Sequence, residues 1–296
     1  MTTTMIEKGK DYAFSMVRLI ATLMIIFCHT FQIIGLTLKY SKILGGIGDF
    51  LSVGVQVFLL MSGLLYGSRN DLFEKEQPLH FFFRNCKKIL LDYYLYSLLV
   101  IFPVYSILDW QGLYTFCGRL FRILTFSNGL FWGVHHLWFI PYIILCYLIT
   151  PFLYDIRKLA KTKLELWLIL FSLIIISEIF RVAYKSYFIA TWINCYVFGF
   201  FMPKLIDGWS EKKKQLITVR FSFIFVASFG IWCVARYILK RYFSASVYAV
   251  ELSDYIMNYT QSFNALFIFM AVVTVYKYCF GNSTPPQIAE ILEYQR

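Results

Sequence analysis

Charged residues are scarce in this sequence. They make up 15% of its 296 residues, whereas hydrophobic residues make up 59% and aromatic residues 20%. A soluble globular domain contains about 25% charged and about 45–50% apolar residues. The composition therefore excludes a soluble enzyme, a disordered chain and a nucleic-acid-binding protein. The net charge of +11 is better explained by basic loops on the cytoplasmic side of a membrane.

Several motifs of soluble catalysis are also missing. The seven cysteines form no CxxC pair, and the four histidines show neither HExxH nor Cys/His spacing. Neither a disulfide framework nor a metal site is therefore expected. The sequence also has no GxSxG nucleophile elbow and no P-loop. Any chemistry must depend on the few polar residues placed within apolar segments.

Long apolar runs supply the main structural signal. Each is close to the length of about 20 residues that a helix needs to cross a bilayer, and none shows the alternation of a membrane β-strand. The sequence predicts about eight transmembrane helices: Phe14–Gly35, Phe50–Gly67, Ile89–Leu108, Leu137–Tyr154, Leu164–Tyr184, Phe188–Leu205, Phe221–Leu239 and Ser262–Phe280. We therefore expect an all-α polytopic membrane helix bundle, forming a single membrane-embedded domain over residues 1–296 with a polar tail at 281–296.

The distribution of Lys and Arg predicts the orientation. With the N-terminus in the cytoplasm, the inner segments hold roughly twice as many Lys and Arg residues as the outer ones. The longest outer segment, 109–136, has apolar residues at helical spacing around Arg119. It is expected to be an interfacial helix or one that packs on the bundle.

Arg18 and His29 are the clearest candidates for function. Both lie in the first apolar run, where a charged or titratable residue is costly. Eleven residues turn a helix about 20° past three full turns, so the two side chains share one face, about 16 Å apart along the axis. Such a face could hold an anionic donor and accept a proton. Alternatively, Arg18 reaches the inner headgroups and His29 bonds to the backbone.

Four motifs in order resemble those of the integral-membrane acyltransferase family 3, the O-acyltransferases of bacterial surface polysaccharides. They are Arg18 with His29, the VGVQVFLLMSG segment at 53–63, the basic run FRNCKKIL at 83–90, and HLWFI at 136–140. They cover residues 14–155, and beyond that only the hydrophobic pattern matches. Family members usually have about ten helices, so we expect the last family helix to be missing or replaced here.

The resemblance implies an enzyme of the bacterial cytoplasmic membrane. It would transfer an acyl group, usually acetyl, from cytoplasmic acyl-CoA to a hydroxyl of a surface polysaccharide or its lipid-linked precursor. Acetyl-CoA would be a co-substrate, with no bound cofactor, no metal and no nucleic acid, and membrane lipid would surround the chain. Arg18 would hold the CoA or its thioester, and His29 would act as the general base. Alternative interpretations are a transporter or export component for the polysaccharide or its precursor, and an inactive truncated family member.

Further residues are candidates for substrate or acyl-CoA binding, each with a simpler structural alternative. Arg84, Lys87 and Lys88 could bind the phosphates of CoA or simply anchor a helix on the inner side. Ser62 and Gly63 could lie in the active site or allow close helix packing. His136 and Trp138 could contact the sugar or belong to the interfacial aromatic belt. Glu178 could orient His29 or pair with Arg181.

Overall fold

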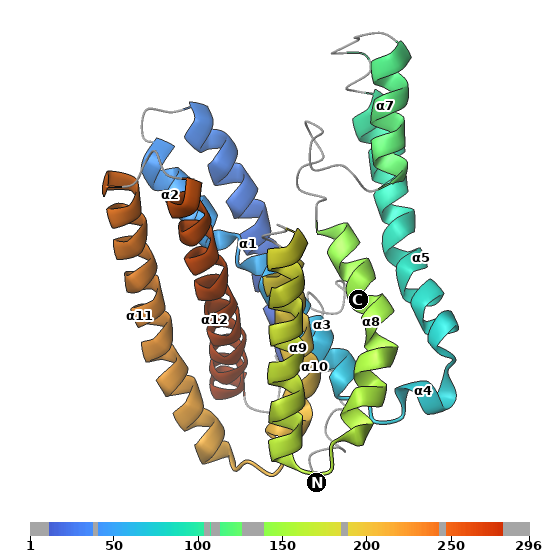
Figure 1. Ribbon diagram of the computed structural model, residues 1–296, viewed down its shortest axis with the longest axis vertical. Coiled ribbons are helices and arrows are strands. Elements are labelled where there is room, and N and C mark those ends of the chain that lie inside the picture. Colours follow the sequence, from blue (N-terminus) through green and yellow to red (C-terminus); the bar gives the residue numbers. More distant parts are fainter. Residues whose placement is uncertain are drawn as a thin grey trace. The chain divides into compact units, whose positions relative to one another are not determined.

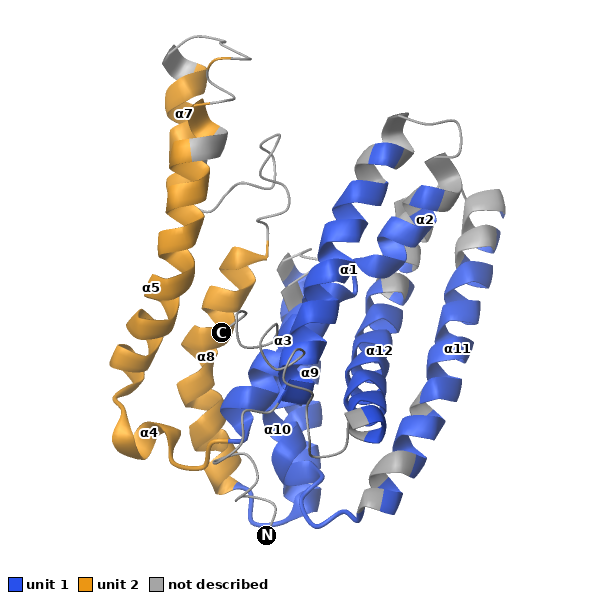
Figure 2. Cartoon of the chain, turned by 180° about the vertical axis from the view of Figure 1, so that it is seen from behind, with its two compact units in different colours: residues 1–68, 160–296 blue, residues 69–159 orange. Residues whose placement is uncertain are grey.

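The computed structural model describes residues 12–37, 41–103, 107, 113–125, 139–184, 189–242 and 247–280. Within these ranges every regular element is a helix, which confirms the all-α prediction (Figure 1). The chain divides into two compact units, coloured separately in Figure 2. Unit 1 comprises residues 1–68 and 160–296, and unit 2 comprises residues 69–159. Residues 281–296, predicted to be a polar tail, lie outside the described residues.

Unit 1 contains the helices that carry most of the candidate residues. They are α1 (Tyr12–Thr37), α2 (Ser41–Leu51), α3 (Gly54–Gly67), α9 (Lys163–Tyr184), α10 (Ile189–Leu205), α11 (Glu211–Tyr242) and α12 (Val247–Phe280). Helix α1 packs against α2, α3 and α12, and α3 packs most extensively against α10. Helices α9 and α11 pack against α10 and α12, respectively.

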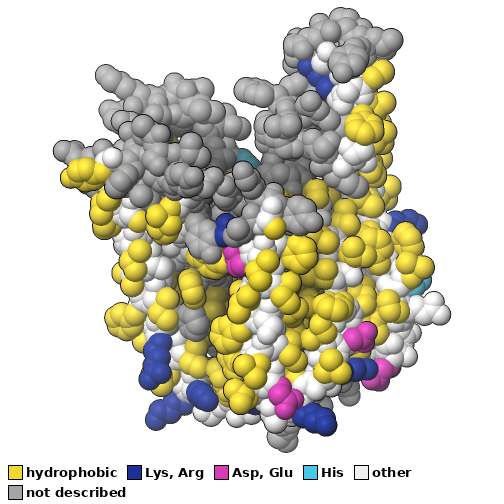
Figure 3. Space-filling view, viewed as in Figure 1, with side chains coloured by type: hydrophobic (Ala, Val, Ile, Leu, Met, Phe, Trp, Pro, Cys, Tyr) yellow, Lys and Arg dark blue, Asp and Glu magenta, His cyan; other side chains and the backbone are white. Residues whose placement is uncertain are grey.

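Apolar surface and helix length together indicate a membrane protein. Five helical segments of the described chain are long and apolar enough to cross a bilayer: Tyr12–Phe31, Gly46–Gly67, Ile140–Leu159, Leu216–Ala235 and Asn258–Tyr276. The other three expected spans fall on α5 with η1, on α9 and on α10, which are not among these five. Large hydrophobic side chains are exposed along α9 and α11, as expected of helices that face lipid (Figure 3). The chain is a multi-pass membrane helix bundle.

Glycines bring α3 and α10 into close contact. Gly63 and Gly67 are one turn apart on α3, and a methyl group on either would clash with the backbone of α10 at Tyr196 or Phe200. Gly199 of α10 meets the backbone of α3 at Leu60 in the same way. Small residues four positions apart commonly let membrane helices approach this closely. Gly63 therefore lies in a helix-packing interface.

The second predicted span is interrupted. Where the sequence predicts one helix over Phe50–Gly67, the structure has α2 ending at Leu51 and α3 beginning at Gly54. At this break the Ser52 hydroxyl donates to the carbonyl of Asp49 at 2.6 Å. Irregular backbone is tolerated at membrane depth only where its polar groups find partners within the protein. The break therefore needs polar neighbours, which the bundle supplies.

Unit 2 contains α4 (Leu72–Lys75), α5 (Pro78–Tyr96), η1 (Ser97–Ile101), α7 (Leu113–Leu124) and α8 (Ile140–Leu159). Helix α7 falls within the outer segment that the sequence analysis singled out. Tyr93 of α5 donates its hydroxyl to the carbonyl of Ile123 at 2.8 Å, and Phe102 contacts Phe116 with ring centroids 4.5 Å apart. Ile123 is fully buried. The segment was expected to be either an interfacial helix or a helix that packs on the bundle, and its helix α7 packs against α5.

Candidate active site

Arg18 and His29 lie on one continuous helix, α1, and both are half-buried. Their spacing places them on nearly the same side of the helix, about 16 Å apart along its axis. Thr22 and Ile25 continue the stripe between them, and the Thr22 hydroxyl donates to the carbonyl of Arg18 at 2.9 Å. A cation and an imidazole are thus held on one stripe of a rigid helix.

One edge of this stripe, at Ile25, meets the beginning of α3. A methyl group on Gly54 would lie 3.0 Å from Cγ1 of Ile25, 3.1 Å from Cβ of Met24 and nearer still to the carbonyl oxygen of Ala21. Ile25 is seven residues after Arg18 and four before His29, so it belongs to the same stripe. The Arg18–His29 stripe therefore borders the buried contact of Ala21 and Met24 with the interrupted helix, and Gly54 allows this close approach.

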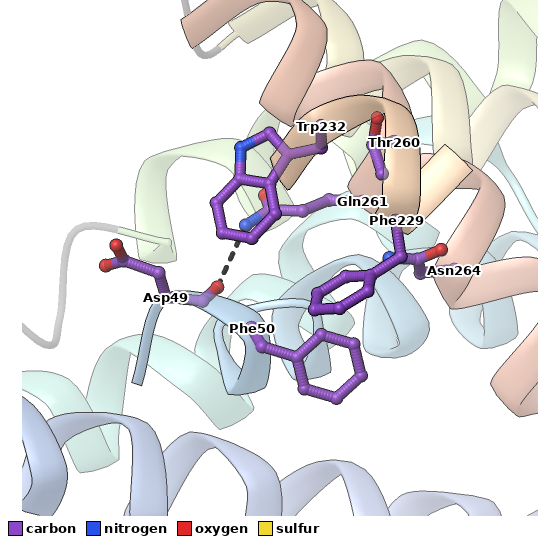
Figure 4. Close-up of a pocket in the computed structure, with 7 residues that line it drawn as sticks. All are labelled: Asp49, Phe50, Phe229, Trp232, Thr260, Gln261 and Asn264. Atoms are coloured by element: carbon purple, nitrogen blue, oxygen red, sulfur yellow. Dashed lines mark hydrogen bonds between the residues drawn. The ribbon is translucent and has the colours of Figure 1, made fainter. Parts of the chain in front are cut away.

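A network of polar side chains surrounds the break between α2 and α3. The amide nitrogen of Gln261, on α12, donates to the carbonyl of Asp49 at 3.1 Å (Figure 4). The same nitrogen donates to the Ser52 hydroxyl at 2.7 Å. Gln56 of α3 donates to the Gln261 side-chain oxygen at 3.3 Å. Gln56 is 1% exposed. Gln261 therefore satisfies the backbone carbonyl that the break leaves without a helical partner.

Helix α12 turns a polar face into unit 1. Asn258, Thr260, Gln261 and Asn264 are all buried there. The Asn264 side-chain oxygen accepts a hydrogen bond from Ser228 of α11 at 3.3 Å. Polar side chains inside a membrane bundle are costly and usually mark function or specific helix pairing. The polar face of α12 is therefore part of the candidate site.

A small cavity adjoins this network. It is lined by Asp49, Phe50, Phe229, Trp232, Thr260, Gln261 and Asn264, and its volume is about 10 Å³ (Figure 4). A cavity of that size holds about one water molecule. Among the described residues, no three His, Cys, Asp or Glu side chains come close enough together to hold a metal ion.

Glu178 forms an ion pair within unit 1. Its carboxylate lies 2.6 Å from Nε of Arg181, and the two side chains are 17% and 7% exposed, respectively. Asn194 of α10 donates to the other carboxylate oxygen at 3.4 Å, and the Ser177 hydroxyl donates to Asn194 at 2.7 Å. Of the two alternatives for Glu178, the structure shows the pair with Arg181.

The basic residues of α5 belong to unit 2. Arg84, Lys87 and Lys88 are all exposed, and Arg84 forms an ion pair with Glu76 at 2.8 Å. Within the described part of the chain, Lys87 and Lys88 have no ion-pair partner. Lys87 also lines a shallow groove whose other walls include Phe83 and Tyr94. This arrangement leaves two ammonium groups free for an anion.

The structure describes only some of the remaining candidates for substrate binding. Ser62 is half-buried on α3, and its neighbour Gly63 packs on α10. His136 and Trp138 lie outside the described residues. In unit 1, the geometry joins Arg18 and His29 in one stripe and places Ser62, Gly63 and Glu178 on α3 and α9.

The sequence analysis missed the polar residues around the helix break. Asp49 is one residue before the expected span Phe50–Gly67, and Gln261 is one residue before the expected span Ser262–Phe280. Neither residue was considered, because both lie just outside the apolar runs that define the expected spans. Asp49 is the only charged residue of the longer segment Gly46–Gly67, and that isolation is the signal that could have identified it.

Comparison with known protein families agrees with the motifs and the fold. A family model described as an acyltransferase domain matches residues 11–291, which is nearly the whole chain and extends well beyond the motifs at 14–155. Comparisons with curated proteins and with solved structures gave no significant match. The length of the family match, together with the helical membrane architecture, shows that the chain belongs to acyltransferase family 3.

Proposed function

We propose that this acyltransferase moves an acyl group from acyl-CoA to a hydroxyl of a cell-surface polysaccharide or its lipid-linked precursor. Acetyl is the acyl group we expect, so acetyl-CoA is the expected donor, with no bound cofactor. The site of action is the cytoplasmic membrane of a bacterium. The observation that carries the proposal is the shared stripe of Arg18 and His29 in a chain of this family.

His29 acts as the general base in the proposed reaction. Its neutral imidazole takes the proton of the acceptor hydroxyl while the oxygen attacks the thioester carbonyl. The tetrahedral intermediate then collapses, the carbon–sulfur bond breaks, and the CoA thiolate leaves and takes up a proton. The products are the O-acyl ester and free CoA. Imidazole suits this role because its ordinary pKa lies close to neutral pH.

Arg18 supplies the positive charge of the stripe. CoA carries phosphate groups, and a guanidinium binds a phosphate or a developing oxyanion through more than one hydrogen bond. In the proposed reaction Arg18 holds the donor or its thioester oxygen. Because Arg18 is half-buried within the span Tyr12–Phe31, its interaction with an anion is stronger than it would be in water.

Other residues are proposed to bind the two substrates. Lys87 and Lys88, with Arg84, bind the phosphates of CoA, because several cations near one anion add their attraction. We assign His136 and Trp138 to the acceptor sugar, since tryptophan stacks well on a sugar ring. Ser62 is proposed to contact substrate, whereas Gly63 and Glu178 support the site through helix packing, Gly63 against α10 and Glu178 through Arg181 and Asn194.

The experiment is an acetyl assay of the surface polysaccharide by proton NMR. A deletion strain is complemented with the wild type, with Arg18→Ala or with His29→Ala, and the membrane abundance of each protein is measured. We expect each variant to lose the acetyl signal while keeping normal abundance. His80→Ala and Arg220→Ala are the matched controls, because both residues are exposed and lie on other helices.

Three results would contradict the proposal. Normal acetylation with His29→Ala would remove His29 from the reaction. A fall in the amount of polysaccharide, with acetylation per repeat unchanged, would favour export over acyl transfer. No change in the deletion strain itself would indicate an inactive protein.

A further inference from the structure

Asp49 is an unexplained carboxylate inside a membrane segment. It lies on α2 within Gly46–Gly67, a candidate span with a mean hydropathy of 1.8, and no other charged residue occurs in that span. A carboxylate in such a segment is costly and is kept when it serves a purpose. The geometry of α1, α2 and α12 indicates what that purpose is.

The helix register places Asp49 level with His29. Helix α1 packs along both α2 and α3, and Gly54 lies beside Ala21, Met24 and Ile25. The chain reverses between α1 and α2, so each residue back from Gly54 corresponds to about one residue forward along α1. Asp49 lies five residues before Gly54. The residue five positions after Met24, which Gly54 contacts, is His29, so Asp49 and His29 are at the same level. The Asp49 carboxylate also acts electrostatically on Cys28, the neighbour of His29.

His29 also lies on the correct side of α1. It is one turn beyond Ile25, whose Cγ1 would be 3.0 Å from a methyl group on Gly54. Residues four apart on a helix project from nearly the same face. The imidazole therefore projects from the edge of the face of α1 that meets the interrupted helix, next to the buried Cys28.

The backbone of Asp49 is fixed by side chains from another helix. Its carbonyl oxygen accepts hydrogen bonds from Gln261 at 3.1 Å and from Ser52 at 2.6 Å. Figure 4 shows that this network holds the main chain of Asp49, while the carboxylate extends away from Gln261. Gln261 and Ser52 thus fix the main chain at the break, and the carboxylate of Asp49 lies on the side away from Gln261.

We propose that Asp49 positions His29 as the general base and that Gln261 holds Asp49 in place. A carboxylate beside an imidazole accepts the N–H of one ring nitrogen, which leaves the lone pair of the other nitrogen free to take a proton. It also stabilises the imidazolium that results. Asp49 touches no reacting atom, so it is a positioning residue. The inference rests on the proposed function only for the role of His29.

Charged residues elsewhere on α1 and on α12 are the other groups to consider at this level. Arg18 shares the face of α1 with His29 but lies about 16 Å away along the axis. Helix α12 also packs on α1, with Phe14 and Phe269 in ring contact at 5.8 Å. Counting about fifteen residues from that contact in opposite directions brings position 254 of α12, an aspartate three residues after Glu251, to the level of His29. Asp254 is therefore the competing carboxylate that the experiment must separate from Asp49.

The test measures the pKa of His29 without using the acyl-transfer reaction. Membrane vesicles containing the full chain are treated with diethyl pyrocarbonate across a pH series, and mass spectrometry follows modification of the His29 peptide. A carboxylate beside an imidazole raises its pKa, so Asp49→Asn should lower the midpoint of His29 by about one pH unit or more. Asp49→Glu keeps the charge and should retain most of the wild-type midpoint. Asp207→Asn, at an exposed position of unit 1, should leave it unchanged.

Three outcomes of this titration overturn the proposal, two of them seen in the Asn variants. One is an unchanged His29 midpoint in Asp49→Asn, and the other is a midpoint that moves with Asp254→Asn instead. Because Asp49→Glu retains the charge, a midpoint in that variant as low as in Asp49→Asn would also contradict the pairing. The His29 midpoint could also move as expected among the variants while the wild-type protein transfers no acetyl group. That result would refute the proposed function and leave the pairing of Asp49 with His29 intact.

Kinetics in the same vesicles then separate positioning from binding. With acetyl-CoA as donor and de-acetylated surface polysaccharide as acceptor, Asp49→Asn should lower kcat by about 10²–10⁴-fold. The KM for acetyl-CoA should stay unchanged, because Asp49 does not contact the donor. Gln261→Leu should lower kcat in the same direction, and Asp49→Glu should restore part of it. A rise in KM with an unchanged kcat would place Asp49 in donor binding and overturn its positioning role.

Discussion

Replacing Gly63 with alanine should disrupt the contact between α3 and α10. The added methyl group would lie 2.9 Å from the backbone nitrogen of Phe200 and nearer still to the carbonyl oxygen of Tyr196. Ordinary contact begins at 3.4 Å, so the helices must separate by at least about 0.5 Å. The obstructing atoms belong to the backbone, so a change of side-chain rotamer cannot relieve the clash.

The expected cost follows from this geometry. Overpacking of a tight interior typically costs about 1–3 kcal/mol, and a backbone obstruction puts Gly63→Ala at about 3 kcal/mol. Alanine also favours helix over glycine by about 1 kcal/mol, which the control must remove. Gly230→Ala on α11 is that control, because a methyl group there meets nothing within 4 Å. The difference between the two variants isolates the clash.

Thermal unfolding in detergent, followed by circular dichroism, measures the difference. We expect Gly63→Ala to unfold roughly 5–10 °C below Gly230→Ala. Adding Gly199→Ala, which obstructs the same interface at Leu60, should cost less than the sum of the single changes. Equal Tm values for Gly63→Ala and Gly230→Ala would refute the close approach of α3 and α10.

Two further predictions concern ion pairs. Glu178→Ala leaves the buried charge of Arg181 without its carboxylate and should lower the free energy of unfolding by about 3–5 kcal/mol. The double variant Glu178→Ala/Arg181→Ala should recover part of that loss. A wild-type Tm in the single variant would contradict this expectation. The hydrogen bond and charge of Lys75 hold the pKa of the exposed Asp71 below its ordinary value. The stability from this pair is present above the ordinary pKa of Asp71 and disappears as pH falls through the lowered pKa. Lys75→Gln should raise the pKa of Asp71 in a carboxyl ¹³C NMR titration, and the control Lys161→Gln should leave it unchanged. An unchanged Asp71 titration in Lys75→Gln would show that the pair does not form.

Some features of the fold could be predicted from apolar runs alone. A helix that spans lipid must satisfy its backbone internally, so long apolar runs predict helices directly. This is why the runs beginning at Phe14 and Leu164 correspond closely to α1 and α9. The same argument fails at Phe50–Gly67, because hydrophobicity does not show where a helix is interrupted. The interruption depends on Gln261, about 200 residues away, which supplies the hydrogen bond that the break requires.

The candidate site shows the same limit. Helical periodicity along one segment was enough to place Arg18 and His29 on one stripe, since both belong to one continuous helix. Periodicity cannot show which residue of another helix faces that stripe. Asp49 was therefore missed, and Gly63 was considered for binding although its neighbours are the backbone atoms of α10.

The sequence by itself determined the membrane setting, the helical class, the family motifs and the Arg18–His29 stripe. Each of these depends on composition or on spacing within one segment. Such local properties can be predicted without knowing how the helices pack. Only the tertiary structure decided that Gln261 secures the broken helix at Asp49 and that Glu178 and Arg181 are joined to α10 through Asn194. These contacts join helices distant in sequence, and a hydrogen bond between them exists only once packing has brought the two side chains within reach of each other.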